Sequence, residues 1–396
     1  MSDARSMNQP TPPADLQTGL IRSAFVTVPC DELQPMLDFF VGQLRFRVDA
    51  IFPADAPSRA LISGYGLNLY LTRGSGQGPA MLRLLCDAPE QVAGGRTELV
   101  APNGMTIGLV HADPPMVVPP TRQQLVLTPS HGDSRWGVGR AGMQYRDLLP
   151  ERHGGGFIAS HIRLLKGGPV PDYVHFHKIR FQLIFCRSGW VRVVYEGQGE
   201  PFILEAGDCV LQPPLIRHRV LESSAGASVV EIGAPASHIT MADHTMTLPS
   251  APLASDHSFS GQRFVRSLAA QAHWKPWVVP GFEARDTGIA EATDGLATVR
   301  VVRAASRGAN GSSTPTTAPN ERALSDSGIP QALRGEFCFH FVLSGRMQVH
   351  TNDASYNLDP DDSITLPDGL PYRLSASDDL SFLEVVLPAD GAQLAH

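Results

Sequence analysis

Two parts of the sequence repeat one pattern, and this repeat restricts the possible folds more than any other feature does. Shared landmarks lie 139 residues apart at the start of the two copies and 153–156 residues apart towards their ends. The increase predicts an insertion of about 17 residues in the second copy, at residues 307–328, where Ser, Thr, Gly and Asn dominate as in a mobile loop. The matched landmarks are Arg146-Asp147 with Arg285-Asp286, Gly156-Phe157 with Gly295-Leu296, His161 with Arg300, Gly189 with Gly345, Pro213 with Pro367, and residues 228–235 with residues 381–388.

Each copy consists of short apolar runs separated by Gly and Pro, which is typical of β-strands joined by turns. The whole chain has 37 Gly and 33 Pro but only 18% charged residues, and this composition excludes a coiled coil. With 42% hydrophobic residues the chain can bury a large core, which argues against disorder. We therefore predict a mainly β protein with two all-β units of ~100 residues each, at residues 141–249 and 264–390.

The residues before the repeat predict a separate, smaller module. Residues 1–20 have no apolar cluster and are expected to form a disordered tail. Residues 21–115 alternate like a strand at 21–29, take on helical spacing at 32–44, and then return to short strands. Four prolines at residues 112–122 mark the boundary to the repeat.

The overall charge and the cysteines narrow the class of partner and the compartment. The formal net charge is −7, which does not favour binding to nucleic acid. No run of about 18 apolar residues occurs, so no membrane span is predicted, and the N-terminus does not resemble a secretory signal. The five cysteines form no CxxC pair, so neither a zinc ribbon nor a disulfide framework is indicated. A cytoplasmic protein is the simplest interpretation.

Three histidines of the first copy have the spacing of metal ligands. His175 and His177 lie two residues apart on a predicted strand, so their side chains point to the same face. His218 follows a Pro-Pro corner on a later strand. Three imidazoles on one wall of a barrel suit a divalent ion such as Fe, Mn, Ni, Cu or Zn. Gln182 could bind the metal through its carbonyl oxygen, or it could contact the ligating residues without binding the metal itself.

The segment around these residues resembles the cupin superfamily, whose two motifs read G-x5-H-x-H-x3-4-E-x6-G and G-x5-P-x-G-x2-H-x3-N. Residues 168–222 match both spacings, and the repeat extends the resemblance to about residues 141–390. The chain departs from the motifs with Gln182 for Glu, Leu215 for Gly and Glu222 for Asn. The resemblance implies two tandem cupin (double-stranded β-helix) barrels and one divalent metal ion, with Fe as the first choice and Zn, Mn or Ni as alternatives. The ligands that it implies are His175, His177, Gln182 and His218.

Three further residues are candidates for catalysis. Tyr173, two residues before His175, could face the same cavity and donate a proton, or it could pack as an aromatic ring at the strand edge. His161 could contact an acidic substrate, or it could have a structural place. Glu231 lies in an apolar strand and could act as a base, but its counterpart Glu384 in the second copy is explained equally well by a shared structural hydrogen bond.

The second copy lacks the pattern of metal ligands. Its counterparts of the four implied ligands are, in chain order, residues near Gln331 and Leu333, then Cys338 and Tyr372. None of them is a histidine, so we predict one barrel with a metal site and one structural barrel. A different pocket, built from His340, Cys338 and Tyr372, is the alternative.

The stretch LDFFVGQLRFRV, at residues 37–48, resembles the helix-to-strand junction of the vicinal-oxygen-chelate, or glyoxalase-like, superfamily. The resemblance covers about residues 21–111 and implies a small α+β module of βαβββ order. A metal site in that family needs two such modules and ligands such as a histidine on the first strand, whereas the first histidine of this chain is His111. We therefore expect a structural or dimerising module, and a homodimer.

Together these features predict an enzyme, a metal-dependent bicupin that acts on a small oxygenated metabolite. A mononuclear Fe(II)-type dioxygenase is the first hypothesis. Because Gln182 replaces a carboxylate, the metal site is more positive and favours an anionic substrate, which also suits a non-redox isomerase, lyase or hydrolase acting on a sugar acid. A barrel that binds a small molecule without converting it is the third hypothesis. Neither nucleic acid nor a membrane is an expected partner.

Overall fold

The structure is a computed structural model that describes residues 17–74, 81–100, 106–131, 136–305, 321–323 and 334–387. It is mainly β, with 48% of the described residues in strands and 10% in helices. The chain divides into two compact units, the first formed by Met1–Phe52 and Pro57–Met116 and the second by Pro53–Ala56 and Val117–His396. No helix in the described part of the chain combines the length and the apolar character that crossing a membrane requires.

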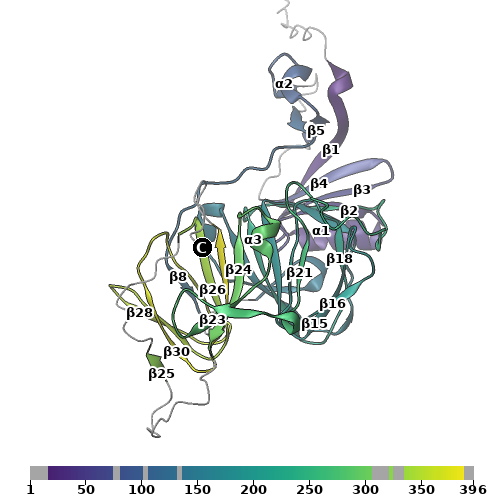
Figure 1. The fold of residues 1–396 in the computed structure, drawn as a ribbon. Coiled ribbons are helices and arrows are strands. Elements are labelled where there is room, and N and C mark those ends of the chain that lie inside the picture. Colours follow the sequence, from purple (N-terminus) through teal and green to yellow (C-terminus); the bar gives the residue numbers. More distant parts are fainter. Residues whose placement is uncertain are drawn as a thin grey trace, which may run out of the picture. The chain divides into compact units, whose positions relative to one another are not determined.

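The first unit contains one mixed sheet with short helices beside it (Figure 1). Its strand order is β2-β3-β4-β1-β5-β7-β6, with β1 parallel to β4 and β5 parallel to β7. The elements β1, α1, β2, β3 and β4 follow one another in βαβββ order, while the glyoxalase-like assignment stays a prediction. The elements of this unit are η1 (Thr18–Leu20), β1 (Ile21–Cys30), α1 (Leu33–Leu37), η2 (Asp38–Gln43), β2 (Arg47–Phe52), β3 (Arg59–Gly64), β4 (Leu67–Arg73), β5 (Met81–Cys86), α2 (Pro89–Val92), β6 (Glu98–Val100) and β7 (Thr106–His111).

The first copy of the repeat forms two sheets within the second unit. One has the order β21-β17-β14-β19-β11-β10-β9, and the other has the order β16-β15-β18-β13-β20 with β12 also paired to β18. The elements of this copy are β9 (Gly137–Val138), η3 (Arg140–Gly142), β10 (Gln144–Asp147), η4 (Arg152–Gly155), β11 (Ile158–Leu164), β12 (Gly168–Pro169), β13 (His175–Lys178), β14 (Phe181–Ser188), β15 (Trp190–Tyr195), β16 (Phe202–Glu205), β17 (Cys209–Leu211), β18 (His218–Ser223), β19 (Ala227–Ala234) and β20 (Ile239–Ala242).

The second copy also forms two sheets, with orders β22-β23-β24-β31-β26-β29-β8 and β25-β30-β27-β28. Its elements are β21 (Val265–Ser267), η5 (Ala269–Gln271), β22 (Trp274–Pro276), β23 (Phe282–Asp286), α3 (Ile289–Ala292), β24 (Thr298–Ala304), β25 (Glu321–Ala323), β26 (Phe337–Ser344), β27 (Met347–His350), β28 (Ser355–Leu358), β29 (Ser363–Thr365), β30 (Arg373–Ser377) and β31 (Ser381–Leu387). Strand β8 (Val126–Thr128) precedes both copies. Strand β25 lies inside the expected insertion, and the rest of residues 307–328 are outside the described part of the chain.

The two copies share one strand order. The order β17-β14-β19-β11-β10 in the first copy recurs as β29-β26-β31-β24-β23 in the second. Each copy also pairs with a strand from outside it. Strand β21, at the start of the second copy, pairs with β17 of the first, and β8, which precedes the first copy, pairs with β29 of the second. The chain therefore builds the second unit from two equivalent halves that exchange an edge strand.

The register of the strands corrects one match in the repeat. Glu231 of β19 pairs with Ser160, and the equivalent Glu384 of β31 pairs with Arg300. Arg300 is therefore the counterpart of Ser160, and not of His161 as the constant spacing predicted. Because side chains alternate along a strand, this shift of one residue moves a side chain to the opposite face of the sheet.

The second unit has three apolar cores, which follow from the alternation of side chains. One core fills the first copy, with Val193 and Val229 among its residues, and another fills the second copy. The largest core lies between the copies, where Phe185 and Ile232 of the first meet Phe339 and Phe341 of the second. Truncating one of these fully buried phenylalanines to alanine typically costs about 3–5 kcal/mol. The two sheets that face this central core are thus fixed against each other.

Candidate metal centre

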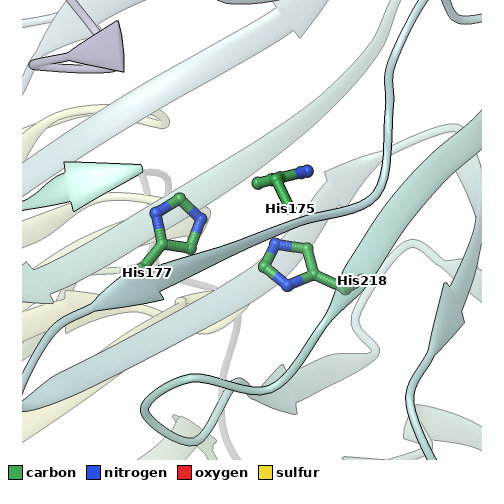
Figure 2. A group of neighbouring side chains, drawn as sticks. All are labelled: His175, His177 and His218. Atoms are coloured by element: carbon green, nitrogen blue, oxygen red, sulfur yellow. The ribbon is translucent and has the colours of Figure 1, made fainter. Parts of the chain in front are cut away.

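Two neighbouring strands bring the three predicted histidines together. His175 and His177 alternate with half-buried positions on β13, and His175 pairs directly with His218 at the start of β18. All three side chains are buried, and one nitrogen of each lies within 4.8 Å of the others. Figure 2 shows the three rings gathered around one point. This cluster is the candidate metal centre.

The hydrogen bonds at the other ring nitrogens decide which atoms face a metal. Nδ1 of His175 lies 2.8 Å from the carbonyl oxygen of Tyr173, and Nδ1 of His218 lies 3.0 Å from that of Ile216. A carbonyl oxygen only accepts, so each Nδ1 carries the proton and each Nε2 keeps a lone pair. His175 Nε2 is buried and has no hydrogen-bond partner within the described residues, as a ligand nitrogen facing a metal would be.

The third imidazole is held in a similar way. Nδ1 of His177 lies 3.0 Å from the hydroxyl oxygen of Thr240 on the adjacent strand β20. Burial lowers the pKa values of His175 and His177 well below the usual value, and it lowers the pKa of His218 to about 4. The rings are therefore neutral near pH 7, which is the form that binds a metal. These residues fit a divalent cation of the kind that the cupin resemblance implies.

The turn before His218 has a leucine, Leu215, where the cupin motif has a glycine. At this position Leu215 has a left-handed backbone, with φ of 67°. A side chain at such a φ costs about 1 kcal/mol. The backbone N–H of Leu215 donates to the carbonyl of His177 at 3.0 Å, which ties the corner to β13. Leu215 thus adopts a backbone conformation that glycine would adopt without this steric cost.

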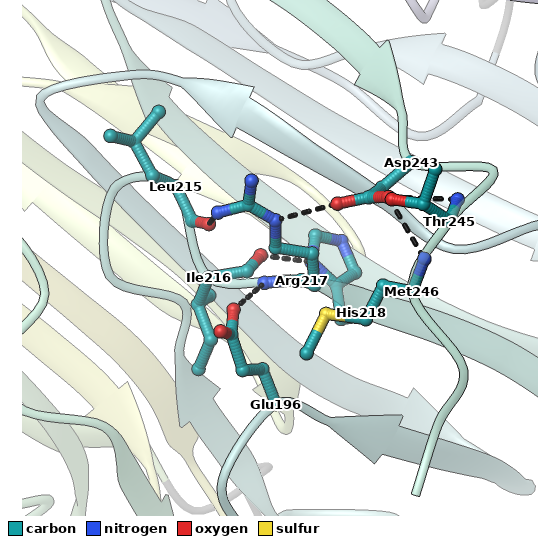
Figure 3. Close-up of polar contacts among 8 residues, drawn as sticks. All are labelled: Glu196, Leu215, Ile216, Arg217, His218, Asp243, Thr245 and Met246. Carbon is teal, nitrogen blue, oxygen red and sulfur yellow. Dashed lines mark hydrogen bonds and ion pairs between the residues drawn. The ribbon is translucent and has the colours of Figure 1, made fainter. Parts of the chain in front are cut away.

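Arg217 holds the same turn in place through hydrogen bonds (Figure 3). Its backbone N–H donates to the Glu196 carboxylate at 3.1 Å, and its Nε donates to Asp243 at 3.1 Å. Burial raises the pKa of Asp243, but the hydrogen bonds from Thr245 and Arg217 have the larger, opposite effect. The resulting pKa is about 2, below the usual value of an aspartate. The carboxylate is therefore charged at neutral pH, and it holds the guanidinium that supports the turn carrying His218.

Gln182 and Glu231 lie side by side at the cavity next to the histidines. Nε2 of Gln182 donates to Oε1 of Glu231 at 2.6 Å, so the amide oxygen is the atom left for another contact. Glu231 is half-buried at the cavity wall, and the loss of solvation raises its pKa. Both residues line a cavity of about 70 Å³ that His177 and His218 also line, and its remaining walls are largely apolar.

A buried ion pair, which the sequence analysis did not identify, completes the wall of this cavity. Arg140 lines the cavity and forms an ion pair with Asp172, whose side chain is fully buried. Asp172 also accepts from the N–H of Val220 at 2.9 Å and lies 3.6 Å from Nδ1 of His175. Asp172 sits inside the first motif, three residues before His175, and this spacing is the signal that could have revealed it.

Two tyrosines that were not predicted line the cavity, and the predicted Tyr173 does not. Tyr145 and Tyr195 are both buried at its wall, and the ring of Tyr195 stacks on that of His218 at 5.5 Å. Tyr173 is not among the lining residues. Its ring lies 5.9 Å from that of His175, while its carbonyl holds that histidine in place. The structure thus gives Tyr173 a positioning contact.

The structure separates His161 from the histidine cluster. On β11, Ile162 lines the cavity, so the neighbouring His161 points to the opposite face. Its ring packs against Trp136 and Phe341, and its Nδ1 lies 3.4 Å from a guanidinium nitrogen of Arg146. Because a guanidinium only donates, this nitrogen of His161 accepts, and the ring is neutral.

We expect His161 to make the protein less stable in acid. Burial is the main cause that lowers its pKa to about 4, whereas an unfolded histidine titrates near 6.5. The unfolded chain therefore takes up this proton first, and stability falls as the pH drops from 6.5 to 4, by up to about 3 kcal/mol. In urea unfolding at pH 7 and pH 4.5, the His161→Gln variant should lose less stability than the wild type. The exposed His257→Gln should behave like the wild type; equal acid losses in all three proteins would contradict the assignment.

The second copy holds a different buried cluster at the equivalent place. His340 and Glu384 are fully buried and lie 3.4 Å apart, and Tyr372 and Cys338 are buried beside them. Among the described residues, the only group of His, Cys, Asp and Glu that is close enough to hold a metal is the histidine cluster of the first copy. The predicted counterparts Gln331 and Leu333 lie outside the described residues.

Comparison with known families finds one match, in the second copy. Residues 318–395 match the family model of the AraC-like ligand binding domain. The match covers about a fifth of the chain, so it describes this segment and not the whole protein. No curated protein sequence matches the chain.

Several solved structures resemble the fold at low scores. Protein Ylba from E. coli has 11% identity and a TM-score of 0.43, covering 70% of this chain and 96% of that one. The oxalate decarboxylase of Lactobacillus farciminis, in a formate complex, has 13% identity and a TM-score of 0.43, covering 65% and 84%. A mutant of salicylate 1,2-dioxygenase from Pseudoaminobacter salicylatoxidans has 14% identity and a TM-score of 0.40, covering 59% and 70%. At these scores the similarity does not extend to function.

Proposed function

We propose that the first copy is the catalytic cupin barrel of a metal-dependent enzyme, and that its reaction is the dioxygenation of a small oxygenated metabolite at a mononuclear iron centre. The observation that carries the proposal is the cluster of His175, His177 and His218, buried, neutral and held within 4.8 Å of one another. When bound, an iron ion with such ligands supplies redox chemistry with molecular oxygen. The proposed boundaries are 21–115 for the first module, 141–249 for this barrel and 264–390 for the second.

The residues around the cluster suit this chemistry. The cavity walls are mostly apolar, including Ile162 and Val229, and so they exclude water from the site. Its volume of about 70 Å³ compares with ~30 Å³ for one water in the liquid, so the substrate must be small or must displace side chains. Arg140 offers a guanidinium at the wall, which favours a substrate with a negatively charged oxygen group. Glu231, with its raised pKa, can hold a proton close to the metal ligands.

Metal analysis of protein purified from its native host, together with an oxygen electrode, tests this function. We expect about one iron per chain and oxygen uptake that depends on added substrate. Small 2-oxo acids and diketones are the compounds to screen first, because they can present two oxygens to one metal ion. Zinc or nickel at full occupancy, with product formed and no oxygen consumed, would exclude a dioxygenase.

Gln182 favours a second function, in which the metal acts without redox chemistry. A neutral amide in the place of a carboxylate leaves more positive charge on the centre, which strengthens the polarisation of a carbonyl group. An isomerase, lyase or hydrolase acting on a sugar acid would use that property. The same measurements separate the two functions, because only the dioxygenase consumes oxygen.

The second barrel supports a binding role in addition to either reaction. Its similarity to the AraC-like ligand binding domain suggests that it binds a small molecule without converting it. If the whole chain were such a binding protein, every tightly bound compound would be recovered unchanged after incubation with the metal-loaded protein. The cytoplasmic location and the homodimer remain predictions.

A further inference from the structure

A second, basic cavity lies away from the metal centre, beside strands β21 to β23. Its volume is about 530 Å³, within the range of sites for small organic ligands. Four of its lining residues are arginine or lysine and one is aspartate, and none of them lines the cavity of the histidine cluster. The charged lining residues are Arg266, Lys275, Arg285, Arg300 and Asp286.

Arg285 is the buried member of this group, with only 3% of its surface exposed. Its Nη2 donates to the carbonyl of Gly207 at 2.6 Å. Its Nε and Nη1 are buried and have no hydrogen-bond partner in the described part of the chain. The nearby carboxylate of Asp208 already accepts from the backbone N–H groups of Ala269 and Glu205, at 2.7 and 3.0 Å. A buried donor without an acceptor is destabilising, so an acceptor from outside the chain would stabilise this arrangement.

The equivalent arginine of the first copy shows what is missing. Arg146 donates to the carbonyls of Asp361 and Pro129, at 2.7 and 3.2 Å, and meets Nδ1 of His161 at 3.4 Å. Asp361 is the counterpart of Gly207, so this one contact is shared by the two copies. Arg146 is thus satisfied by three groups of the protein, whereas Arg285 keeps one.

The residues that replace the other two partners explain the difference. By strand register, Val301 stands where the first copy has His161, and its side chain offers no acceptor. Leu268 stands where the first copy has Pro129, and its carbonyl accepts from the N–H of Gln271 at 3.1 Å. The cavity adjoins this position, since Leu268 and Arg285 both line it.

We propose that this cavity binds an organic anion through a phosphate or carboxylate group, with Arg285 as the anchor. The anion's oxygens would supply the acceptors that Arg285 lacks. Lys275 and Arg266 are exposed at the wall and add attraction for negative charge. Arg300 contributes less, because it lies 3.6 Å from the buried carboxylate of Glu384. The site is independent of the metal chemistry proposed for the first copy.

Titration calorimetry on the full-length protein tests the proposal, with inorganic phosphate and succinate as separate probes. Both are titrated into the wild type and into His177→Ala, so that binding at the metal centre is recognised by its loss in that variant. We expect saturable binding of at least one probe in both proteins; phosphate alone would indicate a phosphorylated ligand, and succinate alone a carboxylate.

Two variants locate the anion. Arg285→Gln should weaken binding at least tenfold, and the exposed Lys275→Gln, which does not disturb the core, should weaken it about threefold. Arg192→Gln removes an exposed arginine on β15 and should leave binding unchanged. The proposal is overturned if neither probe binds saturably to the wild type, or if Lys275→Gln and a folded Arg285→Gln bind as the wild type does.

Discussion

The His177→Ala variant is expected to lose its metal, with less than about a tenth of an ion per chain where the wild type holds close to one. Only two imidazoles, those of His175 and His218, then remain, and the amide oxygen of Gln182 at the same cavity is too weak a donor to take the place of the third. Elemental analysis after dialysis against a mild chelator measures the effect. Retention of one metal ion per chain would refute the centre.

The same variant also tests how strongly the metal stabilises the fold. A metal present at a thousand times its Kd adds about 4 kcal/mol to the free energy of unfolding, because it binds only the folded chain. Wild-type protein should therefore melt at a higher temperature with metal than without it, and His177→Ala should show no such difference. His161→Gln is the matched control, since it changes a buried histidine on the other sheet of the same copy, where the side chain points away from the cavity; it should keep both its metal and the shift.

The grouping of the three histidines could be predicted from the sequence because it depends on local rules. His175 and His177 share a face on account of the two-residue period of a strand, and a Pro-Pro corner brings His218 back to the same wall. The sequence also shows that Leu215 replaces the glycine of the motif, but it does not show that the backbone of Leu215 is left-handed. Features that depend on a few neighbouring residues, such as the shared face of His175 and His177, are thus the same in the structure as in the prediction.

The rest of the site depends on register and on distant contacts, which spacing alone does not determine. The constant offset matched His161 with Arg300, although a shift of one residue makes Ser160 the counterpart. Arg140 lies just outside the predicted start of the first barrel, and only the fold carries it to Asp172. In the sequence nothing distinguishes Tyr195 from the apolar residues of its strand. Only the structure shows that its ring stacks on that of His218.

Exchanging Gln182 and Glu231 should strengthen metal binding. In the wild type the amide at 182 donates to the carboxylate at 231, at 2.6 Å. In the double variant Gln182→Glu with Glu231→Gln, the introduced amide donates to the introduced carboxylate, so the hydrogen bond is kept with its direction reversed. The negative charge then stands at the position that carries the ligand in the cupin motif. We expect the Kd for the metal to fall at least about tenfold, measured by competition with a chromogenic chelator.

The single variants show whether Glu231 positions Gln182 or only fills space. Glu231→Met removes the acceptor, frees the amide to turn, and should weaken metal binding about 10–100-fold. Gln182→Glu alone places two carboxylates in contact in a buried site, so one of them must stay protonated and the gain of the double variant should be largely lost. The visible absorption of the cobalt-substituted protein gives a second readout, since its intensity reports the number of ligands. If the double variant binds metal as weakly as Glu231→Met does, and the cobalt spectrum is the same in all variants, the amide of Gln182 does not face the metal.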